Sequence, residues 1–157
     1  MSIQKGDKVP AATFMTMGAD GPEPIDTDTL FKGKRVALFA VPGAFTPTCS
    51  AKHLPSFKDQ AEAIKAKGVD TIACTSVNDV FVMHAWGKDQ GVSDEMHMLA
   101  DGNGAFAKAI GLELDASGFG MGARSQRYAM IVDNGTCLLY TSPSPRDLST
   151  SRMPSSA

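Results

Sequence analysis

Apolar residues along most of the chain alternate between short, nearly continuous runs and stretches with helical spacing. The clearest run is Arg35 to Val41 (RVALFAV), which lies between Lys34 and Pro42. Such a run is typical of a central strand that is covered on both faces. Further strands are predicted at four shorter runs, residues 13–17, 69–76, 96–100 and 128–132.

Helices are expected between these strands. Apolar side chains recur three or four residues apart at Leu54, Phe57, Ala61 and Ile64, which predicts an amphipathic helix that contains Pro55 in its first turns and ends at Gly68. A second helix is expected over Val80 to Gln90, with Asn78 or Asp79 as its N-cap, and a third over Gly104 to Ile110. Strands and helices that alternate in this way predict an α/β domain with parallel strands in its sheet.

The last twenty residues break this pattern. Asn134-Gly135 is a good hairpin turn signal, and Leu138 to Tyr140 can pair with the strand at 128–132 across it. Beyond that point the chain is rich in Ser, Thr and Pro and has no amphipathic period. We therefore predict a domain over residues 1–136 and an atypical tail over residues 137–157 that is disordered or non-native.

Length and composition narrow the class of protein. The chain has 157 residues, of which 43% are hydrophobic, enough for one domain with a single core. The net charge of −2 gives no basic surface, so no nucleic-acid partner is expected. No apolar run follows Lys5 and Lys8, so no secretory signal is expected. No window of the sequence has the apolar length that a membrane span requires, so none is expected. Three cysteines do not form a disulfide framework, and we expect a reducing, cytoplasmic setting.

The candidate chemistry lies in the loop after the central strand, at residues 42–50 (PGAFTPTCS). Cys49 opens the following helix, where free N–H groups and the helix dipole favour an anion. The thiol pKa of Cys49 should therefore fall below the free value of about 8.5. Thr46 can hydrogen-bond the sulfur or an incoming oxygen, and Pro42 and Pro47 stiffen the loop. A thiolate held in this way suits attack on an O–O bond.

These residues carry a recognisable pattern. The active-site signature of peroxiredoxins is Pro, three residues, Thr, two residues and Cys, which Pro42, Thr46 and Cys49 match. The longer string PGAFTPTCS followed by His53-Leu54-Pro55 resembles the peroxiredoxin 5 (type II) subgroup. The resemblance covers residues 3 to 135. It includes the segments at residues 74–79, 81–83 and 124–128.

The resemblance implies a thioredoxin-like fold, with a central mixed sheet flanked by helices, and a homodimer. It implies that Cys49 is the peroxidatic cysteine, which peroxide oxidises to a sulfenic acid. Thr46 would position the peroxide oxygens and Pro42 would shield the sulfur. Arg127 would lower the thiol pKa and stabilise charge on the leaving oxygen, with Arg124 as a rival for that role. The implied activity is reduction of hydrogen peroxide and small alkyl hydroperoxides in antioxidant defence, without a metal or organic cofactor.

The regeneration of Cys49 has two interpretations. Cys74 lies within an apolar strand, where a cysteine is usually inert core, yet some plant-type members resemble this spacing and use that cysteine as a resolving thiol. A disulfide would require the two Cα atoms to lie within about 7 Å. The alternative is an external reductant, glutathione with glutaredoxin or else thioredoxin. Cys137 receives no role.

Other interpretations stay open. A thiol–disulfide oxidoreductase on the same fold is weakened by the missing C-x-x-C, because Lys52 stands three residues after Cys49. A non-enzymatic redox sensor or holdase would use oxidation of Cys49 as a switch.

Other side chains receive weaker assignments. Phe45, Phe81, Met83 and Trp86 are expected in the core, at a dimer face or at an apolar rim of the site. The spacings of His53, His84 and His97 fit no zinc pattern. Gly118, Gly120 and Gly122 are expected in a flexible loop.

Overall fold

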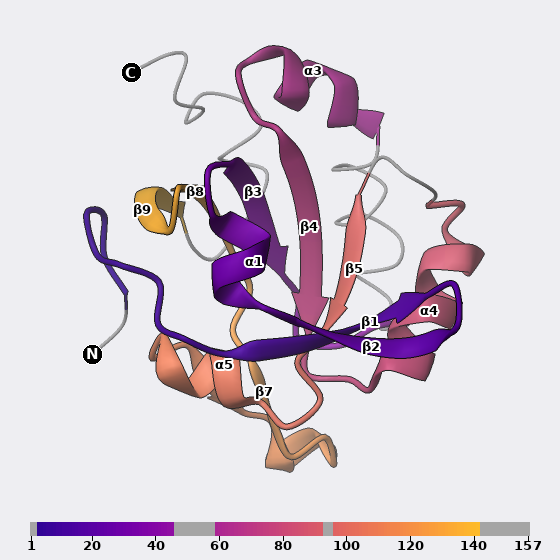
Figure 1. Cartoon of the computed structure of the whole chain (residues 1–157). Helices are drawn as coiled ribbons and strands as arrows, with labels where there is room; N and C mark the ends of the chain where they lie inside the picture. The colour runs from indigo at the N-terminus through magenta and orange to yellow at the C-terminus, as the bar shows by residue number, and fades with distance from the viewer. Residues whose placement is uncertain (1–2, 46–58, 93–95, 142–157) are drawn as a thin grey trace.

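A seven-stranded mixed sheet with helices on both faces forms the body of the protein (Figure 1). The computed structural model describes residues 3–45, 59–92 and 96–141. Strands β3 (Arg35–Ala40), β4 (Thr71–Ser76) and β5 (His97–Ala100) run parallel at the centre. The antiparallel outer strands are β1 (Thr13–Gly18), β2 (Gly21–Asp26), β8 (Tyr128–Asp133) and β9 (Thr136–Thr141), in the sheet order β2-β1-β5-β4-β3-β8-β9. The predicted α/β class with a central mixed sheet is confirmed.

The central strands are buried because helices cover both faces of the sheet. On one face, α3 (Ala61–Ala66) and α4 (Val80–Asp89) share an apolar cluster with Phe39. On the other, α1 (Thr27–Phe31) and α5 (Ala105–Ala109) share a cluster with Leu38. Successive side chains of β3 point to opposite faces, which explains why its sequence reads as a continuous apolar run.

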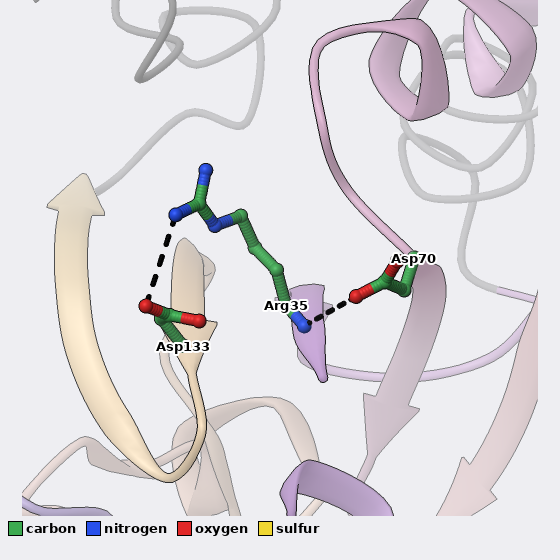
Figure 2. A network of polar contacts seen from close by, with 3 residues as sticks. All are labelled: Arg35, Asp70 and Asp133. Atoms are coloured by element: carbon green, nitrogen blue, oxygen red, sulfur yellow. Dashed lines mark hydrogen bonds and ion pairs between the residues drawn. The ribbon is translucent and has the colours of Figure 1, made fainter. Parts of the chain in front are cut away.

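Polar contacts fasten the sheet where β3 begins (Figure 2). The backbone N–H of Arg35 donates to Asp70 Oδ2 at 2.9 Å, and Arg35 Nη2 lies 3.7 Å from Asp133 Oδ2. Asp70 precedes β4 and Asp133 ends β8, so one residue of β3 contacts both neighbouring strands. The ion pair is partly exposed, and a pair of this kind stabilises a fold only modestly.

The predicted hairpin after β8 is present. Asn134 and Gly135 both have positive φ, 49° and 87°, as the tight turn between β8 and β9 requires. Residues 137–141 of the predicted tail belong to β9, and Cys137 is buried. Residues 142–157 lie outside the described residues, so the division into a domain and a tail stays a prediction.

Strand β2 was not expected, because its sequence contains two prolines. Pro22 and Pro24 pair with Met17 and Met15 of β1, and β2 is an edge strand, where a missing N–H is tolerated. Asp26 then caps α1 by accepting from the N–H of Thr29 at 2.7 Å.

The segment of Gly118, Gly120 and Gly122 lies within a second small hairpin. It contains the 3₁₀ helix η2 (Ser117–Phe119), between β6 (Glu113–Asp115) and β7 (Ala123–Ser125). Of the helix predicted to run to Gly68, the described part is α3, and Leu54 and Phe57 lie outside the described residues.

Candidate active site

The register of the central strands brings two predicted site residues to one end of the sheet. Ala40 of β3 pairs with Tyr128 of β8, so Arg127 stands before that pair and Pro42 follows it by two residues. On the other side, the N–H of Val41 donates to the carbonyl of Thr75 at 3.1 Å. Pro42 and Arg127 therefore enter and leave the sheet at the same end.

Arg127 is half-buried, and its Nε atom is shielded from solvent. Ala129 and Ile131 of β8 face the cluster beneath α3 and α4. Because side chains alternate along a strand, Arg127 continues toward this same face. The chain that follows Phe45 leads to α3 on that face. Thr46 and Cys49 lie outside the described residues, so their predicted roles stay predictions.

Arg124, the rival arginine, is engaged with backbone carbonyls. Its Nε donates to the carbonyl of Met121 at 3.0 Å, and its Nη1 donates to the carbonyl of Val77 at 3.1 Å. Arg124 lies in β7, whereas Val77 lies in the turn between β4 and α4. This arginine thus ties the small hairpin to the turn beside the candidate site.

The turn after β4 contains a residue whose part in the site was missed. Asn78 was considered only as a helix cap, but the N-cap of α4 is Asp79, which accepts from the N–H of Val82 at 2.8 Å. Asn78 Oδ1 instead accepts from the N–H of Ala44 at 3.0 Å and from the hydroxyl of Ser76. No sequence signal identifies such a contact, because its two partners are 34 residues apart.

A buried carboxylate, Asp101, follows β5 at the same end. Its two oxygens accept from the N–H groups of Phe106 and Ala107, each at 3.0 Å. Burial raises the pKa of Asp101 above its ordinary value, and the backbone hydrogen bonds oppose that rise. With both oxygens bonded to the start of α5, Asp101 organises a helix rather than exchanging protons with a substrate.

Cys74 is fully buried in the cluster beneath α3 and α4, with Met83 and Trp86. It pairs with Phe39 on one side and Met98 on the other, so it occupies the middle of the sheet. Cys74 and Cys137 are both buried. Because Cys49 lies outside the described residues, pairing of Cys49 with Cys74 stays a prediction.

Metal-binding groups and membrane-spanning helices are both absent from the described ranges. Among residues 3–45, 59–92 and 96–141, no three His, Cys, Asp or Glu side chains gather as a metal-binding group. None of the helices in those ranges has both the length and the apolar character needed to cross a bilayer.

Comparison with known proteins places these features in a family. The family model described as Redoxin matches residues 4–152. Peroxiredoxin-2E, chloroplastic, of Arabidopsis thaliana is 49% identical over 138 residues, which cover 85% of this chain and 59% of that protein. Peroxiredoxin-2B of the same plant is 47% identical over 133 residues, which cover 84% of this chain and 82% of that protein. The chain thus spans about three fifths of the length of the first of these relatives.

A solved structure agrees with the sequence matches. The crystal structure of reduced Prx3 from Vibrio vulnificus in complex with hydrogen peroxide has a TM-score of 0.86 and 51% sequence identity, and the match covers 92% of this chain and 90% of that one. The expected thioredoxin-like arrangement is therefore confirmed. With the family model matching almost the whole chain and relatives at nearly half identity, the chain belongs to the peroxiredoxin family.

Proposed function

We propose that the protein is a thiol peroxidase that reduces hydrogen peroxide and small alkyl hydroperoxides through Cys49. The Cys49 thiolate attacks the terminal oxygen of the hydroperoxide, so that an S–O bond forms as the O–O bond breaks. The leaving alkoxide or hydroxide takes up a proton, and Cys49 becomes a sulfenic acid. Peroxide is the oxidant in this step, and the sulfur supplies both electrons.

The observation that carries this proposal is the common exit of Pro42 and Arg127 at one end of the sheet. Pro42 precedes Thr46 and Cys49 in sequence, and Arg127 lies at the end of the sheet from which Pro42 departs. A cation there favours the thiolate and stabilises charge on the leaving oxygen. The Vibrio vulnificus relative, which holds hydrogen peroxide in its reduced form, supports peroxide as the substrate.

The sulfenic acid is returned to the thiol by an external donor, glutathione with glutaredoxin or else thioredoxin. A first donor thiol forms a mixed disulfide with Cys49 and releases water, and a second donor thiol displaces Cys49 as its thiol. The complete burial of Cys74 supports an external donor, because an internal disulfide would have to draw that sulfur out of the core.

A second copy of the chain is the proposed partner of an apolar surface beside the site, which makes the protein a homodimer. This surface consists of Phe45, Phe81 and Phe119, which are 49%, 63% and 86% exposed. Hydrogen bonds join the three segments that carry them, from Ala44 to Asn78 and from Arg124 to Val77 and Met121. Exposed aromatic side chains are typical of an interface.

The cytoplasm is the proposed location. Three cysteines that do not form a disulfide framework suit a reducing compartment. A fluorescent fusion of the full-length protein, viewed beside compartment markers, tests this. A signal confined to an organelle would contradict it.

Peroxide consumption by the wild type and by Cys49→Ser tests the central proposal. The donor is first glutathione with glutaredoxin and then thioredoxin with its reductase. We expect the wild type to consume peroxide and Cys49→Ser to be inactive with either donor. The faster donor identifies the reductant class. A folded, reduced wild type that consumes no peroxide would contradict the proposal and favour the redox-sensor alternative.

A further inference from the structure

The loop that leads to Cys49 is held by a side chain from another part of the chain. Ala44 donates its N–H to Asn78 Oδ1 at 3.0 Å, across 34 residues of sequence. The hydroxyl of Ser76 donates to the same oxygen. The amide oxygen of Asn78 therefore accepts two hydrogen bonds, one of which comes from the loop.

Directly after Ala44, the backbone adopts an unfavourable conformation. Phe45 has φ of 64°, in the left-handed region that bulky residues rarely occupy. Its side chain is 49% exposed, so burial of the ring does not explain this conformation. Strained backbone of this kind persists where neighbouring contacts determine it, and it concentrates at functional sites. The hydrogen bond from Ala44 to Asn78 lies directly before Phe45 in the chain.

Asn78 is itself fixed to regular structure on both sides. Ser76, at the end of β4, donates its hydroxyl to Asn78, and the hydroxyl oxygen also lies 3.2 Å from the sulfur of Met83 in α4. Asp79 caps α4, and the carbonyl of Val77 accepts from Arg124. Asn78 therefore lies between the end of β4 and the start of α4. Residues held by regular elements are positioned more accurately than residues on free loops.

We propose that Asn78 is a positioning residue for the peroxidase reaction. Through Ala44 it holds Phe45, the residue before Thr46 in sequence, in the left-handed conformation. Asn78 need not touch the peroxide. This inference rests on the proposed function of Cys49.

The test compares Asn78→Ala with the matched control Asp26→Ala, which removes one hydrogen bond to a backbone N–H at the start of α1, on the other face of the sheet. Each variant is measured for its second-order rate constant with hydrogen peroxide, for the pKa of the Cys49 thiol from the pH dependence of alkylation, and for its thermal midpoint. We expect Asn78→Ala to react about 10²-fold more slowly, since a misplacement of about 1 Å has that effect. Asp26→Ala should lower the midpoint and keep the rate.

Two further variants separate positioning from general loss of structure. Asn78→Asp keeps the acceptor, so at a pH well above the thiol pKa its rate should return to within about threefold of wild type. Phe45→Gly removes the penalty of the left-handed conformation. When it is combined with Asn78→Ala, the total loss should be smaller than the product of the two single losses.

The outcomes distinguish this inference from the proposed function. Active wild type with equally active Asn78→Ala overturns the inference and leaves the peroxidase proposal standing. Equal rate losses in Asn78→Ala and Asp26→Ala, or strictly multiplicative losses with Phe45→Gly, also overturn it. A wild type whose peroxide consumption does not depend on Cys49 overturns both.

Discussion

Ala40 and Tyr128 face each other as partners across β3 and β8, and this pair sets the end of the sheet at which Arg127 lies. Arg127 precedes Tyr128 and so lies at the end of the sheet from which Pro42 departs. Arg124 lies three residues earlier, in β7, and donates to the carbonyls of Val77 and Met121. The two arginines thus have different surroundings, which makes their proposed roles separable by experiment.

Replacement of Arg127 by Gln should slow reduction of peroxide and raise the pKa of the Cys49 thiol. We expect a loss of about 10²- to 10³-fold in the second-order rate constant, the range typical for removal of one group that stabilises developing charge. Stopped-flow kinetics with hydrogen peroxide and the pH dependence of alkylation check the two effects.

Arg124→Gln is the control. It should lower the free energy of unfolding by about 1.5–3 kcal/mol through the loss of hydrogen bonds from a charged group, while the thiol pKa stays near that of the wild type. If Arg124→Gln shifts the pKa of the Cys49 thiol and Arg127→Gln does not, then Arg124 has the role proposed for Arg127.

Removal of Cys74 should leave the catalytic cycle intact. Cys74 is fully buried between Phe39 and Met98, and Ala fills most of its place without a polar atom. We expect Cys74→Ala to turn over peroxide with glutaredoxin or thioredoxin at a rate within about threefold of wild type, with some loss of stability from the smaller side chain. Steady-state kinetics and thermal unfolding measure the two effects.

Mass spectrometry of the oxidised wild type under non-reducing conditions provides the second readout. Peptides linked through Cys49 and Cys74 should be absent after one equivalent of peroxide. Their accumulation, together with loss of turnover in Cys74→Ala, would instead establish Cys74 as the resolving thiol.

The pH dependence of stability should carry a contribution from Asp101 with an unusual sign. Its pKa is raised in the folded state by burial, so the folded protein binds this proton more tightly than the unfolded chain does. The contribution of Asp101 to the free energy of unfolding therefore falls as pH rises from the ordinary carboxyl pKa through the raised one. Above the raised pKa it is constant.

Urea unfolding of wild type and Asp101→Asn, from about pH 4 to about pH 7, isolates this contribution. The variant should be less stable throughout, by about 1–3 kcal/mol, because an amide has one acceptor for the two N–H groups of Phe106 and Ala107. The difference between wild type and variant should shrink as pH rises. A difference that grows with pH would show that the folded state favours the charged carboxylate.

A charge on the exposed phenylalanine surface should dissociate the proposed homodimer. Phe81→Glu and Phe119→Glu each place a carboxylate where 63% and 86% of an aromatic side chain is exposed. Sedimentation velocity should give the mass of a dimer for wild type and of a monomer for either variant, since an unpaired charge at an interface is strongly unfavourable. Lys32→Glu, at the end of α1 on the other face of the sheet, is the control and should stay dimeric. A monomeric wild type would contradict the proposal.

The sequence was most informative where a segment is buried on both faces. The apolar run at residues 35–41 corresponds to β3, and the runs at 69–76 and 128–132 correspond to β4 and β8. A strand buried on both faces has apolar side chains at nearly every position, so it appears in the sequence as a continuous apolar run. Asn134-Gly135 gave the β8–β9 turn because few residues adopt two successive positive φ angles.

Local pattern could not predict features that depend on partners distant in sequence. Strand β2 was missed because its prolines argue against a strand unless the strand is known to lie at an edge. Asn78 and Asp79 were equivalent as helix caps, and the choice follows from the contact of Asn78 with Ala44. The place of Arg127 beside Pro42 required the register of β3 against β8, which residue spacing does not encode.

The contacts of Arg35 have a practical consequence. They fasten β3 to β4 and β8 at the end of the sheet opposite Pro42 and Arg127 (Figure 2). The Arg35–Asp133 pair is partly exposed and is therefore weakened by salt. Substitutions that strengthen the contacts of Arg35 are therefore expected to leave the proposed peroxide site unchanged, because that site belongs to the other end of the sheet.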